Sequence, residues 1–371
     1  MLRRFQPHRH CLLLYFSALV FSFTCIQSAQ AHKEEQIKMV VVGDTGIGER
    51  AYRPGFDAVT AAMRKENAMI LLHLGDFVYQ DRLFSATCPD HYINTIKQTL
   101  TTPFPVRVFV AGDNDLPPVK WKPKASGCWD KIAPLATPFD TLKGSSAEGA
   151  SSGPGPREGV MRFGLALVVV LDAFAWKDPA PWLKPLIKEA RAKHQWVIVA
   201  LHEPALTTAW YVDKRQTVLK QINALAPDLV FAGNQHSYER FYPLGVPDEY
   251  GSLPFVEKSD YLQGEGVTHI VAGGGGATFK PFADLSGKNK NAAPPEVKQA
   301  LAKRALMFHY LTVEMDDHRL TVKTFRVCTQ ETPEGNPRWR PQMKVWETTP
   351  LECDGQPPGV TLYDTVTIRN P

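Results

Sequence analysis

Five apolar segments of the chain each lead into an acidic residue or a histidine. The first three precede Asp44, Asp76 and Asp113, and a glycine stands directly before each aspartate. The last two precede His202 and a short polar stretch that ends at His236. In open α/β sheets, binding sites are built at the edge where the carboxyl ends of the strands meet. Carboxylates and imidazoles that meet at such an edge favour a site for a divalent or trivalent metal ion.

Buried strands with intervening helices are needed to bring these residues together. Apart from Lys38, residues 37–42 form a continuous, largely β-branched apolar run, which is typical of a strand buried on both faces. Four later segments have the same character: 68–74, 106–111, 196–201 and 229–232. Apolar residues at helical spacing over 51–66 predict a helix between the first two strands.

Helices alternate with strands in the first half of the chain, whereas strands dominate toward its C-terminus. We expect strands at 310–315, 319–327 and 360–368, and we assign residues 310–371 to a second sheet. This order predicts an α/β fold with two stacked mixed β-sheets flanked by helices. Residues 116–159 are rich in proline, glycine and serine, and we interpret them as a lid or insertion over the site.

The first residues have the composition of an export signal. Arginines at positions 3, 4 and 9 precede an apolar run over 11–26, and Ala29-Gln30-Ala31 matches a cleavage site. We therefore assign residues 1–31 to a signal peptide and residues 32–371 to one domain. An uncleaved membrane anchor is the alternative, although the run is short for a span of about 20 residues. Export would place the mature chain in a secreted, periplasmic or other extracytoplasmic compartment, with no membrane attachment after cleavage.

Composition and charge narrow the range of partners. Of the 371 residues, 44% are hydrophobic and 22% are charged, which is an ordinary globular composition. The formal net charge is +4, and removal of residues 1–31 takes away three arginines and no acidic residue, which leaves +1. The sequence has no basic patch with interleaved aromatic residues, so we expect no nucleic-acid partner.

Four cysteines remain after removal of the predicted signal peptide: Cys88, Cys128, Cys328 and Cys353. An even number of cysteines in an exported chain predicts two disulfides. No CxxC pair is present, which argues against a zinc ribbon. Three pairings are open to four cysteines, and proximity in the sequence favours Cys88–Cys128 and Cys328–Cys353.

In this order, the five motifs resemble those of the calcineurin-like metallophosphoesterases and, within them, the purple acid phosphatases. The family pattern is GDxG, GDxxY, GNH followed by Asp or Glu, VxxH, and GHxH. The counterparts here are Gly43–Gly46, Gly75–Tyr79, Gly112–Asp115, Val199–His202 and Gly233–His236. Tyr79 marks the subgroup, because the tyrosine at that place is an iron ligand in purple acid phosphatases. The resemblance spans about residues 37–278, and five ordered motifs are a specific signal.

The resemblance implies a four-layer metallophosphoesterase-like sandwich with two metal ions at the sheet edge. Carried over by position, the first metal would be held by Asp44, Asp76, Tyr79 and His236. The second would be held by Asp76 as the bridging ligand together with Asp113, His202 and Asn234. Iron is expected at the first site, and Mn, Mg, Ca or Zn at the second. A hydroxide held between two such cations attacks phosphorus in a small phosphorylated substrate.

Three positions depart from the family pattern, and all three bear on the second metal site or on proton transfer. The family's asparagine ligand is replaced by Asp113, and the first histidine of GHxH is replaced by Asn234. These changes favour harder cations such as Mn, Mg or Ca. The family's leaving-group acid is replaced by Asn114, whose amide cannot donate a proton as a general acid. Asp115 could serve instead if its pKa were raised, so Asn114, Asp115 and His202 are the candidate catalytic residues.

Three classes of function are therefore open. The first is an exported metal-dependent phosphatase or phosphodiesterase. The second is a metal- or phosphate-binding pseudoenzyme with a degenerate second metal site, and the third is a structural protein that retains parts of the motifs. The structural protein is the least favoured, because a fold kept only for packing would not need ligand-type side chains at five strand ends. Between the other two classes we favour the enzyme, while a fold can persist without its function. The sequence does not distinguish a monoester from a diester substrate, and it leaves the oligomeric state open.

Cleavage after Ala31 predicts a mature chain that begins at His32. The full-length chain can be expressed in a host with a general secretory pathway, and the exported product can be sequenced from its N-terminus. We expect the sequence to begin His-Lys-Glu-Glu. A membrane-bound product that retains residues 1–31 would support the anchor instead.

Overall fold

The computed structural model describes residues 36–48, 53–79, 88–120, 125–139, 155–210, 215–249, 251–279, 282, 292–329, 353 and 356–371. The predicted signal peptide lies outside the described residues, as do residues 121–124 and 140–154 of the predicted lid. No helix in the described part of the chain is long and apolar enough to cross a membrane.

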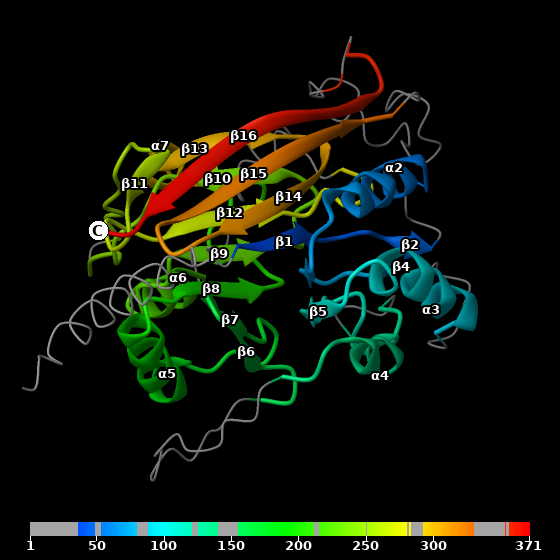
Figure 1. The fold of residues 1–371 in the computed structure, drawn as a ribbon, viewed down its shortest axis with the longest axis horizontal. Coiled ribbons are helices and arrows are strands. Elements are labelled where there is room, and N and C mark those ends of the chain that lie inside the picture. The colour runs from blue at the N-terminus through cyan, green and yellow to red at the C-terminus, as the bar shows by residue number, and fades with distance from the viewer. Residues whose placement is uncertain are drawn as a thin grey trace, which may run out of the picture. The chain divides into compact units, whose positions relative to one another are not determined.

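The first seven-stranded sheet contains the strands that lead into the three aspartates (Figure 1). Its order is β11 (Asp260–Leu262), β16 (Gly359–Arg369), β15 (Arg319–Cys328), β14 (Phe308–Met315), β1 (Ile37–Val42), β3 (Ile70–His73) and β5 (Val106–Phe109). Strands β1, β3 and β5 are parallel neighbours, so their carboxyl ends lie along one edge. The antiparallel pairs β1–β14, β14–β15 and β15–β16 extend the sheet on its other side.

The second seven-stranded sheet contains the strands that lead into the histidines. Its order is β13 (Leu301–Ala305), β10 (Tyr238–Phe241), β12 (Thr268–Ala272), β9 (Leu229–Ala232), β8 (Trp196–Leu201), β7 (Ala166–Val170) and β6 (Gly159–Phe163). Strands β7, β8, β9 and β12 run parallel. A two-stranded sheet joins β2 (Ile47–Gly48) to β4 (Val78–Tyr79) beside the first aspartate turns.

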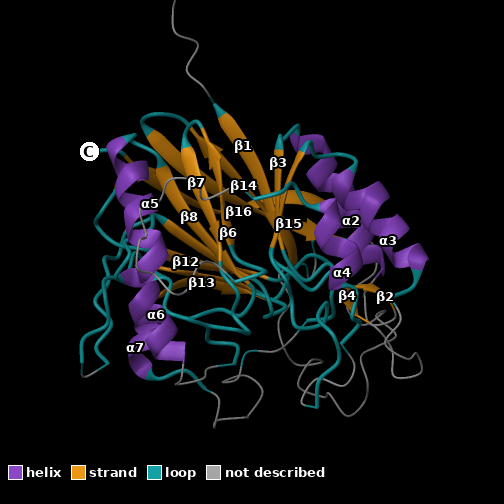
Figure 2. Cartoon of the chain, turned by 90° about the horizontal axis from the view of Figure 1, so that it is seen from below, coloured by secondary structure: helices purple, strands orange, loops and turns teal. Residues whose placement is uncertain are grey.

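The two large sheets pack face to face, and helices cover their outer faces (Figure 2). In β1, Met39 and Val41 belong to the core between the sheets, whereas Val40 and Val42 pack in the core beneath the helices. This alternation follows from the two-residue period of a strand and explains why all four residues from Met39 to Val42 are apolar.

The helices divide between the two outer faces. One group is α2 (Arg53–Met63), α3 (Asp90–Ile96) and α4 (Trp129–Ile132), with short turns of helix at Arg64–Glu66, Lys97–Thr101 and Ala133–Leu135. The other is α5 (Ala180–Ala192), α6 (Arg215–Asn223) and α7 (Pro295–Gln299). The predicted α/β fold of two stacked mixed sheets flanked by helices is therefore confirmed.

The assignment of residues 310–371 to a second sheet needs correction. Strands β14, β15 and β16 join the sheet that already contains β1, because β14 pairs antiparallel with β1 in a register that sets Val40 opposite Thr312. Alternation along a strand indicates how its faces are buried but does not identify its neighbour. The second sheet is built instead from the middle of the chain, between β6 and β13.

Both predicted disulfides are present. Cys88 bonds to Cys128, and Cys328 at the end of β15 bonds to Cys353. The first disulfide joins the segment before α3 to the residue that precedes α4. It therefore fixes the outer helices beside the loop that carries Asp113 and Asp115.

Candidate metal centre

The predicted ligands come from five strand ends, and the two sheets contribute different chemistry. Asp44, Asp76 and Asp113 follow β1, β3 and β5 of the first sheet. His202 follows β8, and His236 lies in the connection between β9 and β10 of the second sheet. One sheet therefore supplies carboxylates and the other supplies imidazoles. Oxygen atoms of Asp44 and Asp76 and a ring nitrogen of His202 all lie within 4.8 Å of one another, and all three residues are buried.

The turns after these strands hold their backbones in an uncommon conformation. Asp44, Asp76 and Asn234 have positive φ angles of 55°, 57° and 63°. Non-glycine residues rarely occupy this left-handed region, although Asp and Asn tolerate it best. Gly75 has a φ of 94°, and a Cβ atom there would lie 2.6 Å from His202 Nδ1. The turn before Asp76 therefore needs glycine both for its backbone angle and for the close approach of the imidazole.

Tyr79 lies at the centre of the first group of ligands. Its hydroxyl oxygen is 3.0 Å from Asp44 Oδ1, 2.7 Å from Asp76 Oδ2 and 2.8 Å from His236 Nε2. His236 Nδ1 donates to the carbonyl of Thr278, which leaves Nε2 of the neutral ring as an acceptor. The phenol has one proton to share among three acceptors, so this geometry suits a cation better than hydrogen bonds alone.

His202 meets a similar excess of acceptors. Its Nδ1 donates to the carbonyl oxygen of Leu74 at 2.6 Å, so Nε2 of the neutral ring carries a lone pair. Nε2 lies 3.3 Å from Asp76 Oδ1 and 3.7 Å from Asp113 Oδ1, and it makes no hydrogen bond with any described residue. A lone pair that faces two carboxylates needs a cation between them. The donor set therefore fits a metal ion at this place as well.

The electrostatics of the site agree with this geometry. Burial, and then the Asp44 and Asp76 carboxylates, raise the pKa of the Tyr79 phenol well above its ordinary value. Burial lowers the pKa of His202, but the neighbouring carboxylates, above all Asp76, outweigh it and hold that pKa well above the ordinary value. The site thus retains protons when no other positive charge is present, as expected of a cluster of ligands that bind cations.

Asn114 lies between two of the carboxylates. Its Nδ2 donates to Asp76 Oδ2 at 2.6 Å and to Asp113 Oδ1 at 3.1 Å, and its backbone N–H donates to Asp76 Oδ1. Its Oδ1 is buried without a hydrogen-bond partner among the described residues. Asn234 reaches the site through its backbone, which donates to Asp44 Oδ2 at 2.8 Å. Ligation of a metal by the Asn234 side chain stays a prediction.

Asp115 occupies a structural position rather than the open side of the site. It is fully buried, and its two carboxylate oxygens accept four backbone N–H groups. The donors are Asp76 and Gly112 to Oδ2, at 2.8 and 3.1 Å, and Phe77 and Val78 to Oδ1, at 2.9 and 3.2 Å. Burial and the Asp76 carboxylate raise the pKa of Asp115 well above its ordinary value, which meets one condition for a general acid. Its oxygens, however, are directed to the turn that carries Asp76.

Two buried acidic residues support the site and were not identified as such from the sequence. Glu239 accepts the hydroxyl groups of Thr207 and Thr208 and so fixes the loop after His202. Asp172 follows β7 at the same sheet edge and accepts the backbone N–H of Phe174. The signal that identified the ligands, an acidic residue after an apolar run, also applies to Asp172.

Two further sequence features have structural roles. His73 in β3 is a packed histidine, as its position before the strand end predicts: it stacks on Phe77 at 3.5 Å and pairs with the hydroxyl of Thr45 at 2.9 Å. The glycine run 273–276 approaches the Asp44 turn, and a Cβ atom on Gly273 would lie 2.8 Å from Asp44 Oδ2. The run therefore allows a tight connection beside the ligands.

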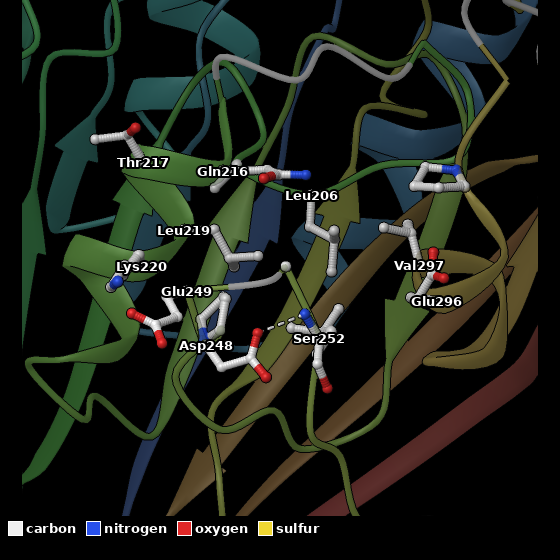
Figure 3. A pocket seen from close by; sticks show the side chains of 15 residues that line it. Leu206, Gln216, Thr217, Leu219, Lys220, Asp248, Glu249, Ser252, Glu296 and Val297 are labelled. Carbon is white, nitrogen blue, oxygen red and sulfur yellow. Dashed lines mark hydrogen bonds between the residues drawn. The ribbon is translucent and has the colours of Figure 1, made fainter.

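A cavity of about 650 Å³ lies elsewhere on the second sheet's helical face (Figure 3). It is lined by Leu206 of the loop after β8 and by residues of α6, α7 and the loop at 247–249 and 251–253, with Leu219 and Asp248 among them. None of the predicted ligands lines it. The metal centre is therefore defined by its side-chain geometry and not by this cavity.

A match to a known family shows which family the chain belongs to. The model of the calcineurin-like phosphoesterase family matches residues 37–238, which is more than half of the chain and runs from β1 to the start of β10. The chain belongs to the calcineurin-like phosphoesterases. The matched region of this chain contains every residue of the candidate metal centre.

Known members of the calcineurin-like phosphoesterases with similar sequences or folds include acid phosphatases. An acid phosphatase of Aspergillus ficuum is 32% identical over 114 residues, which cover 29% of this chain and 19% of that protein. A probable inactive purple acid phosphatase of Arabidopsis thaliana is 24% identical over 292 residues, which cover 71% of this chain and 45% of that protein. The chain thus spans less than half the length of these curated relatives.

The fold is also that of a solved purple acid phosphatase. The structure from yellow lupin seeds superposes with a TM-score of 0.59 at 15% identity, over 91% of this chain and 54% of that one. Similarity to purple acid phosphatases therefore extends beyond the motifs to the arrangement of the two sheets.

Replacement of Asp115 by asparagine tests its structural role. An amide has one acceptor oxygen and turns its NH₂ group toward N–H donors, which leaves buried amides of the Asp76 turn unpaired. We expect Asp115→Asn to lower the free energy of unfolding of the metal-free protein by about 2–5 kcal/mol. Urea denaturation followed by circular dichroism measures this change.

Asp113→Asn is the matched control. The Asp113 carboxylate is 11% exposed and lies beside other carboxylates, so loss of its charge relieves repulsion in the metal-free state. We expect no comparable loss of stability from it. If Asp115→Asn is as stable as the wild type, the structural role is wrong and Asp115 is again a candidate for the general acid.

Proposed function

We propose that the protein is an exported, metal-dependent phosphoric ester hydrolase that uses two metal ions. The observation that carries this proposal is the contact of the Tyr79 hydroxyl with Asp44, Asp76 and His236 at one buried point. A phenol, two carboxylates and an imidazole form a mixed oxygen and nitrogen set that suits a trivalent or late first-row cation. We assign iron to this first site.

The second site is proposed at His202 and Asp113, with Asp76 shared between both sites. His202 is the nitrogen donor here, because position 234 is an asparagine. Cations bound in such a pair of sites supply an activated water at neutral pH and neutralise charge on the phosphoryl oxygens. The extra charge of Asp113 and the missing imidazole favour Mn, Mg or Ca over Zn at this second site.

The chain's own residues orient the ligands and exclude water. The carbonyl groups of Leu74 and Thr278 hold the Nδ1 protons of His202 and His236, so both Nε2 atoms face the centre. Asp115 holds the backbone of the Asp76 turn through four amides. Asn114 can donate hydrogen bonds to a phosphoryl oxygen but not a proton to the leaving group, so substrates with good leaving groups are expected to react fastest.

A metal- or phosphate-binding pseudoenzyme is the second candidate. Asn114 is the observation that favours it, because its amide spans Asp76 and Asp113 where the family has a histidine. The Arabidopsis relative is itself named as probably inactive. Turnover decides between the two candidates, since a pseudoenzyme could also bind a metal ion or phosphate but would not hydrolyse an ester.

Export and a small phosphorylated substrate complete the proposal. The two disulfides support a location outside the cytoplasm, where disulfides persist. A family of phosphoesterases supports a phosphorylated substrate. We propose no nucleic-acid partner, and no membrane attachment once the signal peptide is removed.

Iron at the first site predicts a visible absorption band. A Tyr79 phenolate on a ferric ion gives ligand-to-metal charge transfer, which divalent zinc or magnesium does not. Protein purified under air is expected to contain stoichiometric iron, to be coloured and to hydrolyse nitrophenyl phosphate. Elemental analysis, absorption spectra and a Tyr79→Phe variant that loses the colour provide the measurements. Stoichiometric metal without iron or colour would reject iron while retaining a metallophosphoesterase.

Variants of the second site test its ligands. His202→Ala removes the nitrogen donor, and we expect loss of one metal equivalent and a fall in turnover of at least about 100-fold. Asn234→His adds a donor, and we expect tighter binding of zinc or iron at the second site. Metal titration with chelator competition and kinetics with nitrophenyl phosphate measure both. Unchanged metal content and rate in His202→Ala would show that His202 is not a ligand.

A further inference from the structure

One aromatic ring, that of Phe174, borders the candidate metal centre next to His202, and we call it the aromatic wall. Phe174 lies in the loop after β7, and its ring centroid is 5.9 Å from that of His202, with an angle of 45° between the rings. Phe174 is half-buried. His202 Nε2 is directed to Asp76 and Asp113. The Phe174 ring therefore lies beside the His202 imidazole and is not one of the candidate metal ligands.

The position of this wall follows from the sheet. Strand β7 runs parallel to β8, and their register sets Val170 opposite Ala200, so the loops after both strands leave the same edge. Strand β6 is antiparallel to β7 and sets Gly159 opposite Val170. The segment before β6 therefore reaches the same edge and can support the loop that carries Phe174.

Asp172 connects these two segments. Its Oδ1 accepts the backbone N–H groups of Phe174 and Ala175, at 2.9 and 3.2 Å. Its Oδ2 forms a 2.6 Å ion pair with Arg157, and the Asp172 side chain is only 3% exposed. With these partners, the buried Asp172 carboxylate holds the turn that carries Phe174 in one conformation. A surface loop that only connected two strands would not need such an anchor.

We propose that Phe174 is a specificity-determining residue that contacts the leaving group of aryl phosphate esters and of related planar, apolar esters. This inference rests on the proposed function and names its substrate class. A phosphoryl group bound to a cation held by Asp76, Asp113 and His202 would bring its ester group toward the side of the site where Phe174 stands beside His202 and offers an apolar contact. An aromatic contact of this kind contributes to binding beyond the area that it buries.

The test compares groups of different shape at equal chemical reactivity. Phenyl phosphate and a fluorinated alkyl phosphate of matched leaving-group pKa separate shape from the ease of bond cleavage. Phenylphosphonate and methylphosphonate, which are not hydrolysed, give the same comparison for binding, measured by calorimetry on the metal-loaded protein. Wild type is expected to prefer the phenyl compound in both pairs.

Phe174→Leu keeps an apolar side chain but removes the ring. We expect it to reduce the preference for the phenyl compound about two- to tenfold in both the kinetic and the binding comparison. Phe174→Tyr keeps the ring and is expected to keep the preference. Phe163→Leu is the matched control, because Phe163 is also half-buried but lies at the opposite end of β6 from Gly159. Its preference is expected to remain that of wild type.

The outcomes separate this inference from the proposed function. A preference that does not change in Phe174→Leu, or that is absent in wild type, overturns the role of Phe174 even when both esters are hydrolysed. If neither ester is hydrolysed but Phe174→Leu reduces the preference for phenylphosphonate, the hydrolase proposal fails and the aromatic wall stands. Failure of wild type to bind either phosphonate overturns the inference.

Discussion

The site depends on an electrostatic constraint: more acceptor groups meet at one buried point than the available protons can satisfy. The Tyr79 hydroxyl has one proton for three acceptors, and the lone pair of His202 faces two carboxylates. Burial of uncompensated charge costs several kcal/mol per group, so such a cluster persists only where the surrounding fold and a cation stabilise it. The rest of the architecture can be understood as the support for Asp76, which contacts both halves of the cluster.

That support is built from groups that do not contact the candidate metal-ligand atoms. Asp115 accepts the amides of the Asp76 turn, and its own carbonyl accepts the N–H of Trp129 at the start of α4. Cys128 precedes that helix and is bonded to Cys88. A chain of contacts thus connects the centre of the site to the outer helices, and the disulfide limits how far the loop can move from the sheet edge.

The two halves of the cluster differ in how completely they match the family. Every side chain of the first group is present and in contact, whereas the second group has an aspartate and two asparagines at positions that differ from the family pattern. The contacts of Asn114 show what this exchange does locally: its amide hydrogen bonds reduce the repulsion between Asp76 and Asp113. The same group lacks an acidic proton, so stabilisation of the cluster and proton transfer are separated here. The choice between hydrolase and pseudoenzyme depends on this separation.

The sequence by itself determined the fold class and the strand ends that carry the candidate ligands, and proximity in the sequence favoured the two disulfide pairs that are present. Each of these depends on local pattern: a continuous apolar run marks a buried strand, and parallel strand ends meet at one edge. The tertiary structure decided which strands are neighbours, and so placed β14, β15 and β16 beside β1 in the first sheet. It also decided the contacts of Asp115 with the Asp76 turn and of Phe174 with His202. Hydrogen bonds and ring contacts between distant segments depend on side-chain direction, which neither spacing nor residue type specifies.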